Sequence, residues 1–247
     1  MEPEVERRLL ELNYIFYQTF AIHFSATRQR IQPGVRKILK NIPINHRILD
    51  VGCGNGNLWC ELLRRGHYGH YIGVDFSPDL LQLAARMECT VSKSRPDNKS
   101  PVFFLLDLTK QDWELPDSIP YDSVFAFAFL HHIPSLELRL SVLQKIKQLI
   151  APTGMLYLSV WQFLNSPKLR TRIQNWSEIG ISKDKVDPDD YLLDWRSGGT
   201  GFRYVHHFSE QELSDLASLS DFHVKSIDYS DGREHNLGLY QIWEPMK

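Results

Sequence analysis

Three closely spaced glycines, Gly52, Gly54 and Gly56, form the segment of this sequence whose spacing most clearly suggests chemistry. They follow the apolar run Ile48–Val51, which has the pattern of a buried strand, and a helical pattern begins near Asn57. Glycine lets a backbone approach a ligand closely and adopt dihedral angles that other residues avoid. A glycine-rich turn between a strand and a helix therefore predicts a nucleotide-binding site.

Acidic residues on either side of this turn indicate which cofactor it binds. Asp75 ends the second apolar run, where doubly wound nucleotide-binding folds place an acid on ribose hydroxyls. Asp50 precedes the first glycine, where it would repel a pyrophosphate but could meet the amino group of a methionine moiety. The chain also lacks the later glycine of the G-x-G-x-x-G dinucleotide fingerprint. We therefore predict that the cofactor is S-adenosylmethionine (SAM).

The predicted cofactor site extends to the third apolar run. Asp107 closes that run, where the adenine amino group would lie, although Asp112 is a nearby competitor. Each acid could instead cap a helix or lie in a solvated loop. The predicted cofactor-binding residues are Asp50, Gly52, Gly54, Asn55, Asp75, Phe76 and Asp107.

The residues after the fourth apolar run bear on the methyl acceptor. This place reads Phe129–Pro134 and lacks the N/D-P-P-Y segment of enzymes that methylate amino groups of bases. The cysteines Cys53, Cys60 and Cys89 are not at acceptor positions, which disfavours a cysteine-dependent attack on a ring carbon. An oxygen acceptor remains as the best prediction.

Two kinds of oxygen acceptor make different demands on the protein. A hydroxyl needs a base, and His131 or His132 could serve near neutral pH. A carboxylate needs orientation and neutralising donors instead. Because adjacent side chains diverge, we expect one of the two histidines to face the cleft.

The apolar pattern predicts the scaffold that positions these residues. Apolar runs and helical patterns alternate, as in a parallel sheet covered on both faces. The predicted strands are Ile48–Val51, Tyr71–Phe76, Val102–Leu106, Ser123–Leu130, Met155–Trp161, Phe222–Tyr229 and Leu237–Glu244. The predicted helices are Pro3–Phe24 (one long or two short), Pro33–Leu39, Asn57–Arg65, Pro78–Met87, Leu136–Ile150 and Glu210–Leu219.

We predict one domain over residues 1–247, with an N-terminal helical extension at about 1–45 and an insertion at about 162–205. The polar stretch Gln162–Gly201 is too long for a structureless loop, so we expect local helices that line a substrate cleft. Ser92–Pro101 is polar, contains two prolines and predicts a surface loop.

Composition narrows the class of protein. Hydrophobic residues make up 43% of the 247 residues and the formal charge is −2, so the chain can bury a core and is not a strongly basic nucleic-acid binder. The three cysteines have no C-x-x-C spacing, so we predict no metal site. Their odd number, without a signal peptide, favours the cytoplasm. No apolar run is long enough to span a bilayer, and no membrane association is expected.

The central motifs resemble class I SAM-dependent methyltransferases. The resemblance is carried by Ile48–Gly56, Gly73–Asp75 and the segment Leu149–Gly154 before a strand. It implies an α/β fold: a Rossmann-like, doubly wound, seven-stranded sheet that is mostly parallel, with an antiparallel last strand and helices on both faces.

Segments outside this core resemble a narrower family, the tRNA wobble-uridine carboxymethyl methyltransferases. That family includes the yeast-type enzyme and the methyltransferase domain of the AlkB-like animal fusion protein. The matching segments are Tyr17–Arg28, the pair His131–His132, Tyr191–Arg196 and Gly201–Leu213. Two positions depart from the pattern, because Val205 stands in place of a tyrosine and Asp194 in place of a proline.

This resemblance implies an activity, a set of acceptor-site residues and partners. The activity is esterification of the carboxymethyl group of a tRNA wobble uridine, and a small zinc-containing activator protein is a second implied partner besides tRNA. The acceptor-site residues are Arg28, His131, His132, Arg203, Tyr204 and His206. Tyr17, Tyr204 and Trp195 could stack on an extruded base. The alternatives are an O-methyltransferase acting on a small metabolite and a SAM-binding protein without catalysis.

Overall fold

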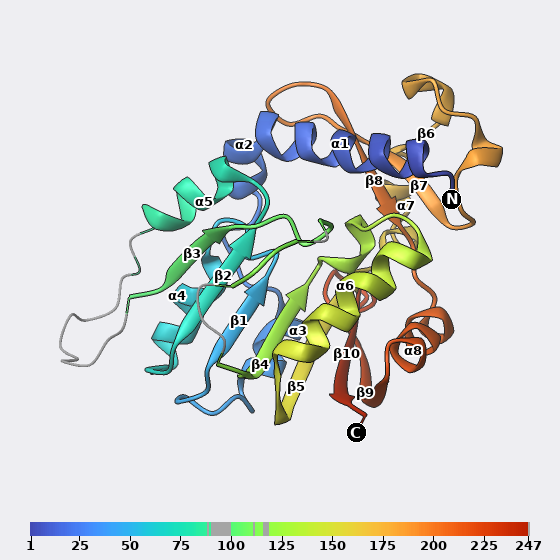
Figure 1. Cartoon of the computed structure of the whole chain (residues 1–247). Coiled ribbons are helices and arrows are strands. Elements are labelled where there is room, and N and C mark those ends of the chain that lie inside the picture. Colours follow the sequence, from blue (N-terminus) through green and yellow to red (C-terminus); the bar gives the residue numbers. More distant parts are fainter. Residues whose placement is uncertain (88, 90–99, 111, 116–118, 247) are drawn as a thin grey trace.

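A seven-stranded sheet forms the centre of the computed structural model, which describes residues 1–87, 89, 100–110, 112–115 and 119–246 (Figure 1). The strand order is β3-β2-β1-β4-β5-β10-β9, and β10 runs antiparallel to both of its neighbours. The strands are β1 (Ile48–Val51), β2 (Tyr71–Asp75), β3 (Val102–Leu105), β4 (Tyr121–Phe127), β5 (Ile150–Trp161), β9 (Phe222–Ser230) and β10 (Gly238–Pro245). The predicted fold class, including the antiparallel last strand, is confirmed.

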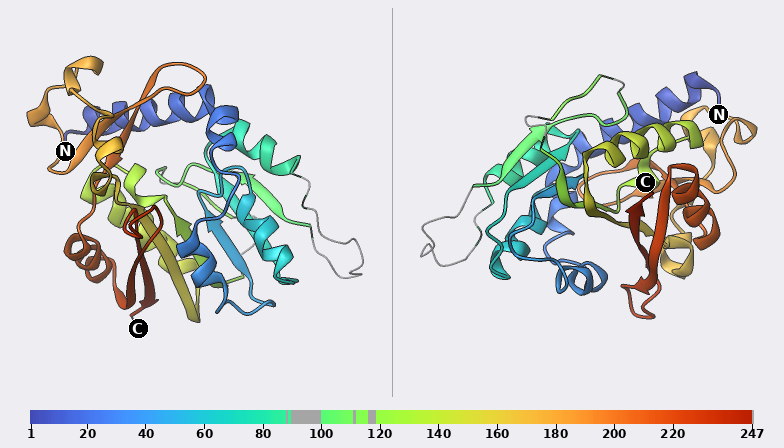
Figure 2. Two further views of the ribbon diagram at one scale, coloured as in Figure 1. Left: turned by 180° about the vertical axis from the view of Figure 1, so that it is seen from behind. Right: turned by 60° about the horizontal axis from the view of Figure 1, so that its bottom comes forward.

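Helices cover both faces of this sheet because its strands carry apolar side chains on alternate sides. On one face, α3 (Pro33–Leu39) and α4 (Asn57–Arg64) bury apolar residues against Ile48. On the other, α6 (Leu136–Leu149) and α8 (Glu210–Leu219) pack with Leu49. Figure 2 shows α3 in front of the sheet when the molecule is seen from behind, whereas α6 lies in front in Figure 1.

The N-terminal segment lies across the carboxyl ends of the parallel strands (Figure 1). It forms two helices, α1 (Pro3–Thr19) and α2 (Ala21–Ala26), and α5 (Pro78–Ala85) packs beside them. Asn13 of α1 is buried and forms two hydrogen bonds with the backbone of Tyr204, 2.9 Å from its N–H and 3.2 Å from its carbonyl. These bonds join α1 to the segment inserted between β5 and α8 (Glu210–Leu219).

That segment contains a second, three-stranded sheet, which the sequence analysis did not predict. Its strands are β6 (Ile173–Gln174), β7 (Asp190–Trp195) and β8 (Gly201–His206), in the order β6-β7-β8. The expected local helices are also present, as α7 (Pro167–Arg170), η2 (Phe163–Asn165), η3 (Trp176–Ile179) and η4 (Lys183–Lys185). Two runs rich in aromatic and aliphatic residues flank the glycine-rich Ser197–Gly201, and this pattern is typical of a hairpin.

Cys60 and Cys89 form a disulfide with an S–S distance of 1.92 Å, and Cys53 is free and buried. This pair, whose members lie 29 residues apart, was not predicted from the sequence. The loop predicted at Ser92–Pro101 lies outside the described residues except for Ser100 and Pro101. Among the helices in the described part of the chain, none combines the length and apolar character that crossing a membrane requires.

Candidate functional site

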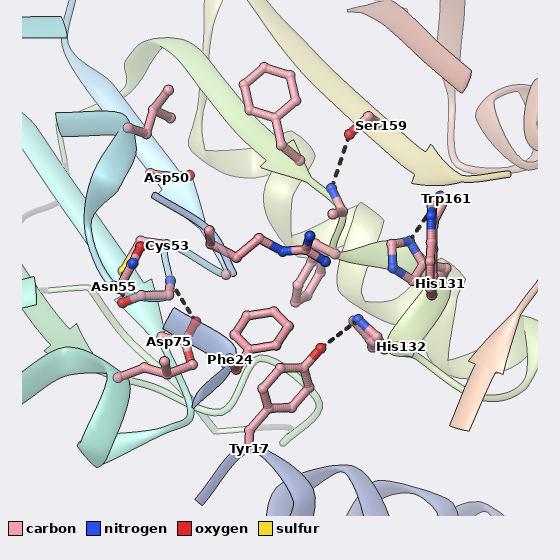
Figure 3. Close-up of a pocket in the computed structure, with 18 of the residues that line it drawn as sticks. Tyr17, Phe24, Asp50, Cys53, Asn55, Asp75, His131, His132, Ser159 and Trp161 are labelled. Carbon is pink, nitrogen blue, oxygen red and sulfur yellow. Dashed lines mark hydrogen bonds between the residues drawn. The ribbon is translucent and has the colours of Figure 1, made fainter. Parts of the chain in front are cut away.

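A cavity of about 400 Å³ lies at the carboxyl ends of the parallel strands, against α1 and α2 (Figure 3). All seven predicted cofactor-binding residues line it. Of the six predicted acceptor residues, the structure brings four to its wall, namely Arg28, His131, His132 and Arg203. Figure 3 shows the acidic residues Asp50 and Asp75 on one side and the histidine pair on the other.

The glycine-rich turn has a backbone that only glycine adopts easily. Gly52 and Gly54 have φ angles of +71° and +54°, in the left-handed region. A Cβ atom on Gly52 would lie 3.0 Å from the Phe129 ring, so this position is also crowded. The turn thereby opens the end of β1 to a ligand.

Asp75 is the buried acid that ties this turn to the end of β2. Its two carboxylate oxygens each accept a hydrogen bond of 2.9 Å, one from the Gly54 N–H and one from the Ser77 N–H. Burial raises the pKa of Asp75 to about 6, against the lowering effect of these bonds. A ligand hydroxyl donating to this carboxylate would replace part of its lost hydration.

Asp50 is a second buried acid and faces the same half of the cavity. It accepts a hydrogen bond of 2.6 Å from the Tyr71 hydroxyl, and burial raises its pKa to about 7. An ammonium group in the cavity would favour the ionised form of Asp50. The amino group of a methionine moiety is such a group.

Asp107 is the third acid in the cofactor half of the cavity wall. Its Oδ1 accepts bonds from the Thr109 N–H at 3.0 Å and the Thr109 hydroxyl at 2.6 Å, so it also closes a local turn. The three acids and the open glycine turn fit the polar groups of SAM.

The opposite half of the cavity contains both histidines of the pair, so the expectation that only one would face the cleft is wrong. His132 lies between the Tyr204 carbonyl, 3.3 Å from Nδ1, and the Tyr17 hydroxyl, 2.8 Å from Nε2. Since a carbonyl can only accept, we assign the proton of His132 to Nδ1. Tyr17 then donates to Nε2. The backbone N–H of Trp161 points at Nδ1 of His131 at 3.4 Å, which assigns the proton of His131 to Nε2.

Both histidines are neutral in this environment. Burial, reinforced by the nearby charge of Arg203, lowers the pKa of His132 to about 3. The pKa of His131 is held well below its usual range, first by burial and then by His132 and Arg203. A histidine with so low a pKa is a poor general base at neutral pH.

Two arginines give this half of the cavity its charge. Arg203 is 6% exposed, and its guanidinium lies over the rings of Trp161, Phe16 and Trp195, at 4.9, 5.4 and 5.8 Å from their centroids. The guanidinium of Arg28 lies 5.0 Å from the centroid of Phe24.

No carboxylate in the described ranges lies within 4.0 Å of either guanidinium, and the buried Nε atom of Arg203 has no hydrogen-bond partner there. Burial lowers the pKa of both side chains from the ordinary arginine value. Two uncompensated cations at one wall favour an anionic ligand.

Tyr204 and His206 do not reach the cavity, which corrects their predicted placement at the acceptor pocket. Side chains alternate along a strand, so Arg203 points to the cavity while these two point to the other face of β8. There Asp190 Oδ1 lies 2.7 Å from the Tyr204 hydroxyl and 2.7 Å from Nδ1 of His206. Arg139 donates to the Tyr204 hydroxyl at 3.1 Å, and Nε2 of His206 lies 2.8 Å from Glu212. These contacts form a buried network that fixes β8.

The side chains expected to stack on a base are also engaged in contacts within the protein. Tyr17 is buried and bound to His132, and Trp195 packs edge-on against Phe16. Trp195 also lies near Phe20 and Phe24 and is absent from the cavity wall described above.

Two asparagines in and after the cofactor turn connect the halves of the site. The Asn55 side-chain amide donates to the Ser25 hydroxyl and that of Asn57 donates to the Arg28 carbonyl, both at 2.8 Å. Asn55 is a predicted cofactor residue, whereas a role for Asn57 in the site was not predicted from the sequence. A polar residue at the start of a helix gives no signal of such a partner nearly thirty residues away. In the described part of the chain, no three histidine, cysteine or acidic side chains gather as metal ligands.

Comparison with known proteins agrees with this geometry. Residues 23–227 match the methyltransferase domain family. The chain belongs to this family. It is 26% identical over 164 residues to a tRNA (carboxymethyluridine(34)-5-O)-methyltransferase of Arabidopsis thaliana, covering 64% of this chain but 34% of that protein. A protein of the same name from Schizosaccharomyces pombe is 26% identical over 195 residues, 79% of this chain and 71% of its own length.

A solved structure with the same fold is a SAM-dependent methyltransferase from Methanosarcina mazei. It superposes with a TM-score of 0.65 at 21% identity and covers 88% of this chain and 99% of its own. At this identity the likeness concerns the fold. The present chain spans about a third of the length of its Arabidopsis relative.

Proposed function

We propose that this protein transfers a methyl group from SAM to a carboxylate oxygen of carboxymethyluridine at the wobble position of tRNA. The observation that carries the proposal is the pairing of Arg28 and Arg203 with two neutral histidines at one wall of the cavity. The acidic wall opposite, with Asp50 and Asp75, suits the cofactor.

The acceptor half favours a carboxylate over a hydroxyl. A hydroxyl must lose a proton, and the histidines are too weakly basic to take it near neutral pH. A carboxylate is already ionised and needs only orientation and neutralising donors. The guanidinium groups of Arg28 and Arg203 supply such donors in a geometry that matches a carboxylate.

When bound, SAM supplies an electrophilic methyl group on a positively charged sulfur. Arg28 and Arg203 orient one carboxylate oxygen toward that methyl group, and the new oxygen–carbon bond forms as the carbon–sulfur bond breaks. The carboxylate becomes a neutral ester, so the arginines lose their anionic partner and the product is free to leave. Tyr17 and Trp161 help exclude water from the reacting atoms.

The tRNA part of the proposal is supported by the names of the Arabidopsis and Schizosaccharomyces relatives and by the segment from Tyr17 to Arg28. This segment supplies three residues of the cavity wall, Tyr17, Phe24 and Arg28. A small zinc-containing activator protein as a second partner, and action in the cytoplasm, belong to the same proposal.

The direct test is to incubate the protein and labelled SAM with total tRNA from cells that lack wobble-uridine carboxymethyl methyltransferase. The reaction is run with and without the family's activator protein. We expect label in a nucleoside ester that mild base releases, and none with tRNA from wild-type cells, where the site is already esterified. Absence of label in both mixtures overturns the tRNA proposal. Label in a small-molecule extract instead supports the metabolite alternative, and SAM binding without turnover on either supports a non-catalytic binder.

A further inference from the structure

One side of α1 contributes a continuous stripe to the cavity wall. Its members are Leu10, Asn13, Tyr14 and Tyr17, which share one side of the helix because Leu10 and Tyr14, and likewise Asn13 and Tyr17, are four residues apart. Tyr17, at the inner end, is 6% exposed and bound to His132. Tyr14, one turn nearer the N-terminus, is 48% exposed. The stripe thus runs from the buried acceptor wall to the mouth of the cavity.

Tyr14 is the most exposed aromatic side chain in the described lining of this cavity. Its ring has one aromatic neighbour in the described chain, Phe76, at 6.1 Å between centroids and a tilt of 37°. Its hydroxyl forms no hydrogen bond with any residue that the structure describes, in contrast to that of Tyr17. A flat apolar surface is therefore left open at the mouth.

We propose that Tyr14 is a binding residue for the acceptor and packs against the planar ring that carries the carboxymethyl group. This inference rests on the proposed function. The carboxylate would be held at Arg28 and Arg203, close to the Tyr17–His132 pair, and the methylene arm would direct the ring outward along the α1 stripe. One helical turn corresponds to about 5.4 Å, which suits the step from a carboxylate to its ring. Stacking on an aromatic side chain is a common way to hold an unpaired base.

The burial of the other aromatic candidates strengthens the assignment. Tyr204 is fully buried on the far face of β8, and Trp195 is packed against Phe16 and Phe20. Tyr17 uses its hydroxyl to hold His132 and has little exposed ring. Of the tyrosines and tryptophans in the described lining, only Tyr14 presents an exposed ring to an incoming nucleotide.

The test compares Tyr14→Ala and Tyr14→Phe with Ile15→Ala as the matched control. Ile15 is the next residue of α1 and is 54% exposed, but it does not line the cavity. With hypomodified tRNA as acceptor and saturating SAM, Tyr14→Ala should raise KM about tenfold, as expected for loss of one stacked ring. Tyr14→Phe should restore most of the affinity, and Ile15→Ala should behave as wild type. Calorimetry should give the same Kd for SAM in all four proteins.

Two outcomes overturn the inference while leaving the proposed function intact. One is an unchanged KM in Tyr14→Ala. The other is a parallel rise in the Kd for SAM, which would place Tyr14 over the cofactor through Phe76. If wild-type protein methylates no tRNA, the proposed function fails instead.

In that case the ring contact is measured by itself, with protein loaded with S-adenosylhomocysteine. Carboxymethyluridine and acetate are compared as ligands that share a carboxylate and differ in the ring. A preference for the nucleoside that Tyr14→Ala removes supports the contact. An equal preference in both proteins contradicts it.

Discussion

The two halves of the cavity are built in different ways. The cofactor half consists of residues at the ends of β1, β2 and β3, three neighbouring strands, and its charged groups are acids. The acceptor half is assembled from α1, the turn after α2, the segment after β4 and the separate strand β8, and its charged groups are arginines. The first half is local and acidic, whereas the second is long-range and cationic. Each half can therefore be disturbed without the other.

Replacing Arg203 should have the largest effect and should be confined to the acceptor half. In Arg203→Met the buried cation is lost while most of the side-chain volume remains, so kcat/KM for the acceptor should fall roughly a hundredfold or more. The Kd for SAM should stay within about twofold, since Arg203 is not among the cofactor residues. Radiometric methylation and calorimetry on the same samples measure the two quantities.

Arg196→Met is the control for that experiment. Arg196 directly follows β7, the neighbour of β8, but is exposed, with its guanidinium 2.6 Å from Asp194. Its loss should change kcat/KM by less than about twofold, since Arg196 is exposed and does not line the cavity. Equal activities of Arg203→Met and wild type would show that the acceptor does not need this charge.

Replacing Asp75 should have the next largest effect, on the cofactor half. Asp75→Ala removes the carboxylate that holds Gly54 and Ser77 and would face the ribose. We expect the Kd for SAM to rise about thirtyfold, since hydrogen bonds to a charged group contribute about 2 kcal/mol. Asp79→Ala, an exposed acid in the first turn of α5, is the control and should bind SAM normally. An unchanged Kd in Asp75→Ala would mean that the ribose lies elsewhere.

The same contrast explains how much could be predicted from sequence. The cofactor residues lie at or close to the carboxyl ends of strands, and parallel strands meet at one edge, so a linear pattern is enough to bring Asp50 and Asp75 to the cavity. The acceptor half depends on strand β8, which falls almost entirely in the insertion predicted at about 162–205 and which the hairpin pattern around Ser197–Gly201 indicates. Without that strand, the alternation that turns Tyr204 and His206 away from Arg203 was not visible. The burial that keeps His131 and His132 neutral cannot be inferred from two adjacent residues of the sequence.

The pH dependence of cofactor binding gives a smaller test of the acidic half. Burial raises the pKa of Asp50 to about 7. Between about pH 4 and pH 7, Asp50 is therefore mostly protonated in the folded protein without cofactor but ionised in the unfolded chain. The contribution of Asp50 to stability therefore decreases as the pH rises from about 4 to about 7, and the ionised form that binds an ammonium group increases over the upper part of this range.

We accordingly expect the Kd for SAM to fall severalfold between about pH 6 and pH 8, as measured by calorimetry. Asp50→Asn should remove most of this dependence. Tyr71→Phe should move its midpoint to higher pH, because the Tyr71 hydroxyl bond lowers the pKa of Asp50. A midpoint that stays in place in Tyr71→Phe would show that another group titrates.

The smallest expected effect concerns the histidines of the acceptor half. We expect the pH profile of kcat to show no titration of either one. His131 and His132 have lowered pKa values, to about 3 for His132, because burial and Arg203 disfavour the charged ring. Both therefore stay neutral from about pH 6 to pH 9, and a carboxylate acceptor stays ionised over the same range. With both substrates saturating, kcat should be flat over this interval, and His132→Gln should change its level without introducing a step.

A hydroxyl acceptor would instead require kcat to rise with the ionisation of a base. A rise with a midpoint near neutral pH that His132→Gln abolishes would therefore identify His132 as a base and turn the choice of acceptor from a carboxylate to a hydroxyl.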